Sequence, residues 1–202
     1  RVVIIGAGYI GLEAVEAAVN LKKEVRIIQL GDRVIPGSFD KEITDIMEAE
    51  LRGHEGVSLN LNEAVSEFEG KDGKISGVKT NKGSYPADIV ILATGVRPNT
   101  KFLEGTGIET LKNGAIVIDG RGRSSIKGIY AAGDCATVYH KIKKENVYIP
   151  LATTSNKIGR VVGENLAGKD REFKGTLGSA AIKVLNLEAG RTGISSDEAE
   201  KM

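Results

Sequence analysis

Three glycines near the start of the chain have the spacing of a turn that binds a phosphate ligand. Gly6, Gly8 and Gly11 form a Gly-x-Gly-x-x-Gly pattern directly after the apolar run Val2–Ile5. In such a turn the first glycine permits the tight bend, the second lets the backbone approach a pyrophosphate, and the third lets a helix pack close to the strand. The free N–H groups and the positive end of that helix then favour the phosphates. We therefore expect a dinucleotide at this turn.

The residue at the end of the next strand should contact the adenosine ribose of that dinucleotide. An acidic side chain about 20 residues beyond the glycines would bond the 2′-hydroxyl and favour NAD. Here the position is Gln29, which can bond a hydroxyl but carries no charge against a 2′-phosphate. Asp32 and Arg33 follow and argue in opposite directions, while no arginine stands at Leu30 or Gly31. The choice between NADH and NADPH stays open, with a slight preference for NADH.

The other reactive side chains form no catalytic or metal-binding set. Cys135 is the single cysteine, so neither an internal disulfide nor a cysteine cluster for a metal can form. We expect it to be a small structural residue. The two histidines, His54 and His140, stand far apart in the sequence, and we expect both to lie in solvated positions. The lysines beside His140 could meet an anionic substrate such as coenzyme A, but a solvated face is the better interpretation.

The glycine turn belongs to an alternating pattern of strands and helices. Strands are predicted at residues 2–5, 25–30, 57–61 and 89–93. The first and last are apolar runs expected to be buried, 57–61 alternates, and the first two strands should pair in parallel around the helix between them. A helix is expected over 10–21. A second helix follows the N-cap Asp40, with an apolar stripe made of Ile43, Ile46, Met47 and Leu51. Three short strand-like pieces with turn signals between them predict an antiparallel meander at 65–69, 75–80 and 84–86.

The second half of the chain has a different organisation. Residues 115–118 and 128–134 are predicted to be strands, and the second of these ends on Gly133 and Asp134. Pro150 is placed to start a helix that Gly168 would stop. Its apolar positions include Leu151, Ile158, Val162 and Leu166. Residues 180–187 are strand-like, and the tail after them should not close a domain by itself.

Composition excludes several classes of protein. The 202 residues include 28 Lys and Arg against 27 Asp and Glu, so no basic field is present to bind nucleic acid. No apolar run approaches the roughly 20 residues of a membrane span or forms a signal-peptide core. We therefore expect neither nucleic acid nor membrane as a partner, and a cytoplasmic location. Because the chain starts at Arg1 and stops within a charged stretch, we expect it to be a piece of a longer protein.

Three motifs can be joined in order. They are the glycine turn continued by Leu12 and Glu13, then Ala-Thr-Gly-Val-Arg-Pro-Asn at 93–99, then Gly-Ile-Tyr-Ala-Ala-Gly-Asp at 128–134. Together they resemble the pyridine nucleotide disulfide oxidoreductases over nearly the whole chain. The segments 148–152 and 175–178, with Lys183 and Val184, resemble the branch of NADH oxidases, NADH peroxidases and coenzyme A disulfide reductases.

The resemblance implies NAD(P)H and FAD as cofactors and gives roles to individual residues. Gly6, Gly8 and Gly11 would hold the NAD(P)H pyrophosphate, Tyr9 would gate the nicotinamide pocket, and Glu13 would orient the ring. Asp134 would bond the ribityl chain of the flavin, and the helix starting near Leu151 and Ala152 would point its N-terminus at the flavin. The remaining cofactor-binding positions implied by these motifs are Ile10, Gln29, Gly95 and Gly133. From residue chemistry alone, Tyr9 can be packing, Glu13 a first-turn acid, and Asp134 a helix cap.

The resemblance also implies a domain arrangement. Residues 1–101 would bind NAD(P)H, 102–173 would be the C-terminal part of an FAD-binding domain, and 174–202 would start the dimerisation domain of a homodimer. The flavin-diphosphate turn and the redox cysteine would precede Arg1, so this chain would hold no stable FAD and show no turnover alone.

The implied reaction passes hydride from NAD(P)H to FAD and then electrons to oxygen, peroxide or a disulfide such as that of coenzyme A. Two alternatives stay open. One is a thiol-independent, flavin-linked reductase of an electron-transfer protein. The other is a non-catalytic NAD(H)-sensing module.

Overall fold

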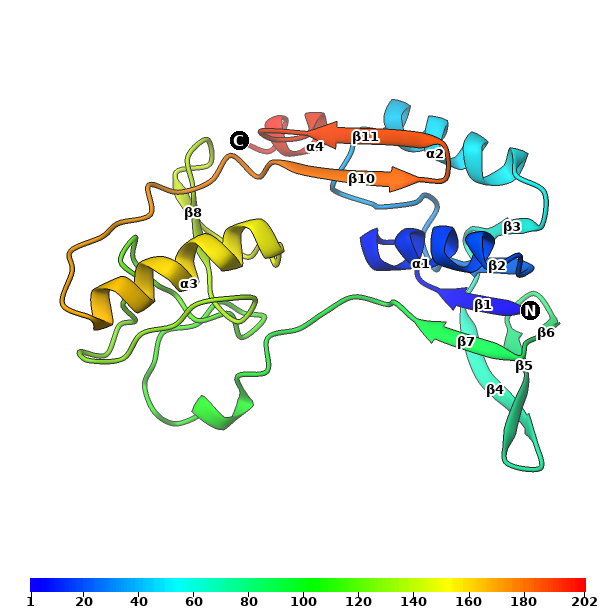
Figure 1. Ribbon diagram of the computed structural model, residues 1–202, viewed down its shortest axis with the longest axis horizontal. Helices are drawn as coiled ribbons and strands as arrows, with labels where there is room; N and C mark the ends of the chain where they lie inside the picture. The colour runs from blue at the N-terminus through cyan, green and yellow to red at the C-terminus, as the bar shows by residue number, and fades with distance from the viewer. The chain divides into compact units, whose positions relative to one another are not determined.

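A parallel sheet of four short strands underlies the first half of the chain (Figure 1). The computed structural model, which describes residues 1–202, places β1 (Val2–Ile5) between β2 (Val25–Ile28) and β7 (Ile89–Leu92). The fourth strand, β3 (Val57–Asn60), pairs with β2, and all three pairings are parallel. Every side chain of β1 is buried, as expected of a central parallel strand. The α/β class, the four strands and the parallel pairing of the first two are as predicted.

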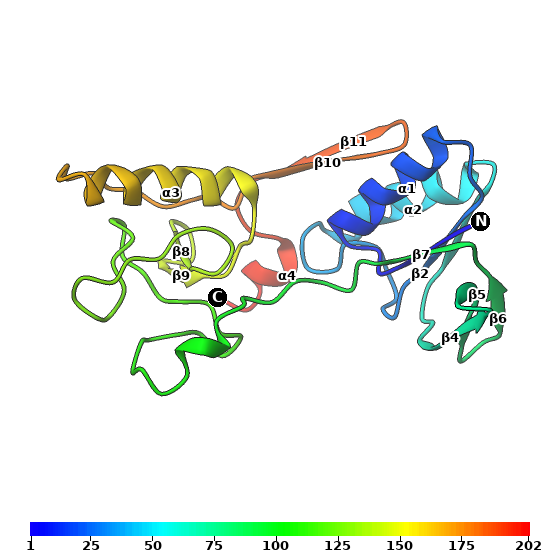
Figure 2. The ribbon, with the colours of Figure 1, turned by 60° about the horizontal axis from the view of Figure 1, so that its bottom comes forward.

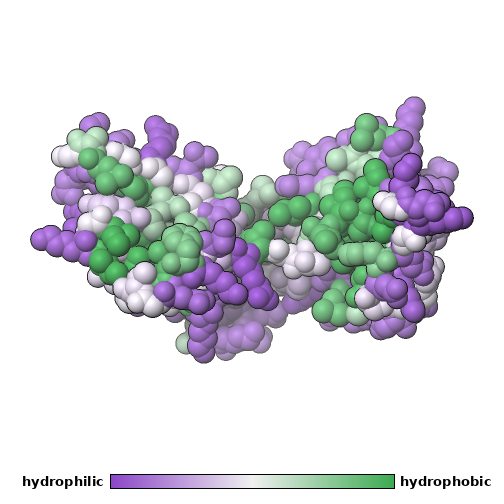
Figure 3. Space-filling model, turned by 90° about the horizontal axis from the view of Figure 1, so that it is seen from below, coloured by the Kyte–Doolittle hydropathy of each residue, from purple (hydrophilic) through white to green (hydrophobic).

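The strand β7 differs from the prediction of a buried strand. Ile89 and Leu92 are 53% and 63% exposed, because β7 lies at the edge of the sheet. Figure 3 shows apolar surface on the right-hand part of the molecule, to which this sheet belongs. The prediction of burial is therefore wrong at both ends of this strand.

Helices cover one face of the sheet. The helix α1 (Tyr9–Asn20) follows the glycine turn, and α2 (Lys41–Gly53) begins after its N-cap Asp40, both as expected. Their buried side chains share one core with the sheet, and these include Leu12, Val15, Ala18, Met47 and Leu51. Ile43 and Ile46 are exposed, so the predicted stripe of α2 is only half right; the third buried position is Thr44.

An antiparallel meander covers the other face of the same sheet (Figure 2). It consists of β4 (Val65–Lys71), β5 (Lys74–Thr80) and β6 (Ser84–Pro86), paired in that order. Val78 and Ala87 pack with Val3, Ile5 and Ile28 in a second core cluster. The predicted meander is confirmed, and it gives each face of the sheet its own cover.

The end of the chain returns to the first core. The predicted single strand at 180–187 is a hairpin of β10 (Ala180–Val184) and β11 (Leu187–Arg191), followed by α4 (Ser196–Ala199). Ile182, Val184 and Leu185 are buried in the same cluster as the side chains of α1 and α2. The strand-like segment was therefore predicted correctly as strand, but it forms a hairpin with the residues after it and packs into the first core.

Two compact units result from these contacts. Unit 1 comprises Arg1–Gly95, Ala181–Arg191 and Ser195–Lys201, and unit 2 comprises Val96–Ala180, Thr192–Ile194 and Met202. The elements above, apart from Ala180 at the start of β10, belong to unit 1. The domain roles expected for 1–101, 102–173 and 174–202 stay predictions.

Unit 2 has little regular structure apart from one long helix. Its elements are η1 (Lys101–Leu103), β8 (Val138–His140), β9 (Glu145–Val147) and α3 (Ala152–Leu166). The helix ends before Gly168, whose φ of +85° and N–H bond to the Asn165 carbonyl terminate it as predicted.

Two strands predicted in unit 2 do not form. Residues 115–118 and 128–134 make only single bridges, such as Ile116 with Ala136 and Arg123 with Tyr130. A strand needs a ladder of consecutive partners, and these segments have isolated ones. Ile116 and Ile118 are nevertheless buried with Ile158 and Val162 of α3, so the apolar pattern correctly identified core residues.

Candidate dinucleotide-binding site

The glycine turn connects the carboxyl end of β1 to α1. Gly6 has a φ of +101°, and a Cβ at this position would lie 2.3 Å from the carbonyl oxygen of Ala93. A Cβ on Gly11 would lie 2.0 Å from the carbonyl oxygen of Gly6. A Cβ on Gly8, by contrast, would meet no atom within 4 Å. The fold itself therefore requires glycine at the first and third positions, whereas Gly8 borders open space that a ligand could approach.

The helix α1 presents an uncompensated N-terminus at this open space. Gly8 is its N-cap, has no side chain to cap it, and no acidic residue lies in the first turn. The first N–H groups of a helix have no carbonyl partner within it, and together with the helix dipole they favour an anion. Ile10 is exposed beside them. Glu13 is exposed in the second turn, so its interpretation as a first-turn acid is wrong.

The side chain of Gln29 contacts the glycine turn directly. Its Oε1 accepts a 2.9 Å hydrogen bond from the backbone N–H of Ala7. Its backbone is held from the other side, because Gln29 N–H donates to the Asn60 carbonyl and the Gln29 carbonyl accepts from Glu63 N–H. The structure thus places Gln29 beside the turn, with its carbonyl oxygen occupied and its amide NH₂ as the remaining side-chain donor.

Tyr9 packs on the loop that follows β2. The side chain is half-buried, with its ring centroid 6.3 Å from that of Phe39 and the planes tilted by 45°. Burial raises the pKa of the Tyr9 hydroxyl, while a hydrogen bond with Ser38 and the nearby charge of Arg191 act in the opposite direction. Tyr9 therefore has packing partners and a polar partner in this loop.

The motif that follows β7 lies next to the same turn. Ala93 N–H donates to the Ile5 carbonyl, and the Ala93 carbonyl faces Gly6. Gly95 has a φ of +110°, and a Cβ there would meet no atom within 4 Å. Gly95, the last residue of the first segment of unit 1, therefore borders open space, and in this respect it resembles Gly8.

Within unit 2, the predicted flavin-associated residues lie together at the start of α3. Asp134 follows Gly133, which has a φ of +87°, and its carboxylate accepts a hydrogen bond from the hydroxyl of Ser155 in the first turn of that helix. Leu151 is the N-cap and Ala152 the first helical residue. Burial raises the pKa of Tyr148, and the negative charge of Asp134 adds to this shift. An acidic side chain and a long helix N-terminus are thus brought together.

Cys135 and His140 differ in how well they were predicted. The Cys135 thiol is half-buried and donates to the Ala132 carbonyl at 3.3 Å, a contact suited to a structural residue. His140 was expected in a solvated loop but is 2% exposed. It ends β8, and its strand pairs with β9 and bridges to Thr176, so its ring is enclosed. No group of three or more His, Cys, Asp or Glu side chains is arranged to hold a metal ion.

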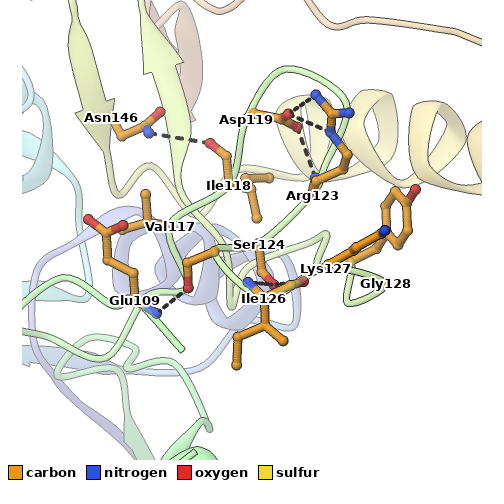
Figure 4. A pocket seen from close by; sticks show the side chains of 12 residues that line it. Glu109, Val117, Ile118, Asp119, Arg123, Ser124, Ile126, Lys127, Gly128 and Asn146 are labelled. Atoms are coloured by element: carbon orange, nitrogen blue, oxygen red, sulfur yellow. Dashed lines mark hydrogen bonds and ion pairs between the residues drawn. The ribbon is translucent and has the colours of Figure 1, made fainter. Parts of the chain in front are cut away.

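Sequence reasoning missed an open cavity of about 720 Å³ in unit 2 (Figure 4). In its wall, Asp119 accepts from the side chain of Arg123, and Asn146 donates to the Ile118 carbonyl. Burial raises the pKa of Asp119, but hydrogen bonds from Arg123 and Arg121 outweigh it, so the pKa is lowered. These polar groups bond to the wall itself, so we place no ligand in this cavity. The motif at 128–134 contributes Gly128 and Tyr130 to this wall, but the other lining residues lie in segments without a recognisable motif, so the cavity was not predicted.

Comparison with known proteins supports the resemblance. A family model described as pyridine nucleotide-disulphide oxidoreductase matches residues 1–159. The chain is 46% identical over 200 residues to an NAD(P)H sulfur oxidoreductase (CoA-dependent) of Pyrococcus abyssi, covering 99% of this chain and 44% of that protein. It is 40% identical over 200 residues to an NADH oxidase of Streptococcus pneumoniae, covering 99% of this chain and 43% of that protein. The chain thus spans less than half the length of these curated relatives.

Solved structures agree with the sequence relatives. A water-forming NADH oxidase from Lactobacillus brevis bound to NADH matches all of this chain and 44% of its own, with a TM-score of 0.90 and 39% identity. An NAD-dependent persulfide reductase from A. fulgidus matches 99% of this chain and 37% of its own, with a TM-score of 0.90 and 36% identity. None of the helices has the length and apolar character needed to cross a membrane.

Proposed function

Because the chain belongs to the pyridine nucleotide-disulphide oxidoreductase family, we propose that unit 1 binds NAD(P)H at the glycine turn as part of a longer FAD-dependent oxidoreductase. The observation that carries this proposal is the combination at Gly8. A side chain would find open space there, while the uncapped N-terminus of α1 lies directly behind it. A pyrophosphate fits this combination, because it brings two negative charges and needs close approach to backbone N–H groups.

Each of the other residues has a proposed contribution. Gln29 would donate its amide NH₂ to the adenosine ribose, since its Oε1 is already bonded to Ala7. Tyr9 would gate the nicotinamide pocket by leaving its contact with Phe39, and Glu13 would orient the nicotinamide ring from the exposed side of α1. When bound, NAD(P)H supplies a hydride and FAD accepts it.

Unit 2 contributes to the proposed flavin site. The carboxylate of Asp134 accepts from Ser155 and retains further acceptor sites for a ribityl hydroxyl. The N-terminus of α3 at Leu151 and Ala152 would stabilise negative charge on the ring of a bound flavin. These residues fit a flavin, and FAD is the second cofactor that we propose for the longer protein.

The terminal acceptor is proposed to be oxygen, peroxide or a disulfide such as coenzyme A disulfide. Among these, sulfur chemistry linked to coenzyme A is favoured, because the identity of this chain to the CoA-dependent sulfur oxidoreductase, 46%, exceeds its identity to the NADH oxidase, 40%. We also propose that the longer protein is a homodimer, as the family resemblance implies.

Calorimetric titration of the 202-residue chain with NADH and NADPH tests the nucleotide site. The matched variant is Gly8→Val, because its side chain enters open space and should leave the fold intact. We expect the chain to bind and Gly8→Val to bind at least about tenfold more weakly, since the new side chain occupies the place of the pyrophosphate. Equal binding by the variant would contradict the site. If this chain does not bind, the same titration of a version extended upstream through the flavin segment decides, and failure there too rejects the function.

A further inference from the structure

The loop after β2 carries a single cation, and the end of the chain holds it. Arg33 is the one Lys or Arg among residues 29–40. Its Nη2 lies 3.0 Å from the carboxylate of Asp197 in α4, within the same unit. The Arg33 side chain is 21% exposed, against 60% for Asp197. The cation is therefore packed in place, and its partner is the more accessible of the two.

Hydrogen bonds hold the segment that carries Asp197 in place. The Ser195 side chain accepts from Glu198 N–H and the Glu198 carboxylate accepts from Ser195 N–H, which forms a capping box at α4. The Ser196 N–H donates to the Asp40 carboxylate at 2.8 Å, and Arg191 of β11 donates to the Ser38 carbonyl. The C-terminal segment is thus bonded to the loop at several points, and Asp197 keeps its position beside Arg33.

The opposite side of the loop is bonded to the glycine turn. Gln29 Oε1 accepts from Ala7 N–H, and the Ile35 N–H donates to the Ala7 carbonyl at 2.8 Å. Residues 30–34 thus form a short loop whose two flanking residues are both hydrogen-bonded to Ala7 of the turn. Arg33 therefore lies on a short segment next to the position at which the adenosine ribose is expected.

We propose that Asp197 sets the preference for NADH over NADPH by keeping Arg33 paired, an inference that rests on the proposed nucleotide binding. A 2′-phosphate needs guanidinium N–H donors, and the Asp197 carboxylate competes for those of Arg33 and repels the phosphate. A 2′-hydroxyl is neutral, so its binding does not depend on whether the N–H donors of Arg33 are occupied. Gln29 carries no charge, so it neither repels the phosphate nor substitutes for the arginine.

The expected size of the effect follows from the ion pair. A partly exposed pair shifts an equilibrium by up to about fivefold, so freeing Arg33 tightens a 2′-phosphorylated ligand by about two- to fivefold. A ligand without that phosphate should change by less. High salt should reduce the difference, because exposed charges are screened.

Titration calorimetry with the adenosine half of each cofactor tests the proposal. Adenosine 5′-diphosphate and its 2′-phosphorylated form lack the nicotinamide, so they need no flavin. Asp197→Asn should bind the 2′-phosphorylated form about two- to fivefold more tightly, and adenosine 5′-diphosphate should change by a smaller factor. In an Arg33→Ala background the same substitution should have no effect. The matched control is Glu200→Gln, which removes an exposed acid at the C-cap of the same helix.

Two results would overturn the proposal while the nucleotide site stands. One is an unchanged ratio of the two affinities in Asp197→Asn, and the other is an equal gain in Glu200→Gln or in the Arg33→Ala background. If neither ligand binds to this chain or to a version extended upstream, the proposed function fails, and this inference fails with it.

Discussion

The side-chain oxygen of Gln29 lies 2.9 Å from the backbone nitrogen of Ala7, so the residue predicted to contact the ribose also stabilises the glycine turn. Replacing it with leucine should leave the Ala7 N–H without this acceptor. We expect Gln29→Leu to lower the free energy of unfolding by about 1–3 kcal/mol and to weaken NADH and NADPH alike. Urea unfolding and titration calorimetry measure the two effects.

The variant Gln29→Glu separates the two roles of this residue. A carboxylate still accepts from Ala7 N–H, so stability should stay within about 0.5 kcal/mol of the parent chain. Its negative charge should weaken the 2′-phosphorylated ligand specifically. A loss of both ligands to the same extent would argue that Gln29 serves the turn alone.

A second prediction concerns the buried carboxylate of Glu63. It accepts from the Thr80 hydroxyl at 2.6 Å and from the Asn60 amide at 2.8 Å. Burial raises the pKa of Glu63, but these bonds and one from Tyr85 outweigh it, so the pKa lies below its ordinary 4.5. A lowered carboxyl pKa stabilises the fold above the ordinary value, and this contribution is lost as the pH falls through the folded value.

The variant Glu63→Gln isolates this contribution from other carboxylates. At pH 7 it should unfold with about 1–3 kcal/mol less free energy, because its amide cannot accept both bonds. The difference from the parent chain should shrink as the pH falls from 4.5, the ordinary value at which the unfolded chain takes up the proton, through the lower pKa of Glu63 in the folded chain. Urea unfolding at pH 7 and at several lower values checks this, and a difference independent of pH would contradict the assignment.

Local patterns predicted much of unit 1, whereas features that depend on distant partners escaped. The glycine turn and α1 follow from spacing alone, since Gly6 and Gly11 are dictated by neighbouring backbone. The exposure of Ile89 depends on strand order, because β7 lies at an edge that no local pattern identifies. Leu185 turns the last hairpin with a φ of +54°, a conformation for which leucine gives no signal.

The candidate site shows the same division. The pattern located Gln29 beside the turn, but its bond to Ala7 spans 22 residues and needs the folded sheet. The pairing of Arg33 with Asp197 spans 164 residues and was not visible at all. His140 was misjudged for this reason, since the lysines around it are a local signal while its enclosure comes from Thr176.

A third prediction compares two glycines of the turn. Gly11→Ala places a Cβ 2.0 Å from a backbone oxygen, so the chain should lose several kcal/mol of stability or fail to fold. Gly8→Ala enters open space at an extended φ of −81°, so stability should stay equal or rise by up to about 1 kcal/mol. Thermal unfolding of both variants checks this. Equal loss in the two would mean that Gly8 is also held by packing.

A fourth prediction concerns the C-terminal hairpin. Ile182 is buried in the core with α1 and α2, whereas Lys183 beside it is half-exposed and pairs with Glu16. Ile182→Ala should lower the free energy of unfolding by about 2–5 kcal/mol, because it leaves a cavity in a packed core. The control Lys183→Ala removes a surface ion pair and should cost less than about 1 kcal/mol.

Nucleotide affinity and hydrogen exchange of Ile182→Ala test whether the hairpin is part of the core of unit 1. Because residues 181–191 are part of unit 1, Ile182→Ala should also weaken nucleotide binding, since the loop bonded to Arg191 and Asp197 loses its support. Hydrogen exchange of the amides in α1 and α2 should rise with it, since their shared core has loosened. A hairpin that merely lies on the surface would leave both the exchange and the nucleotide affinity of Ile182→Ala unchanged.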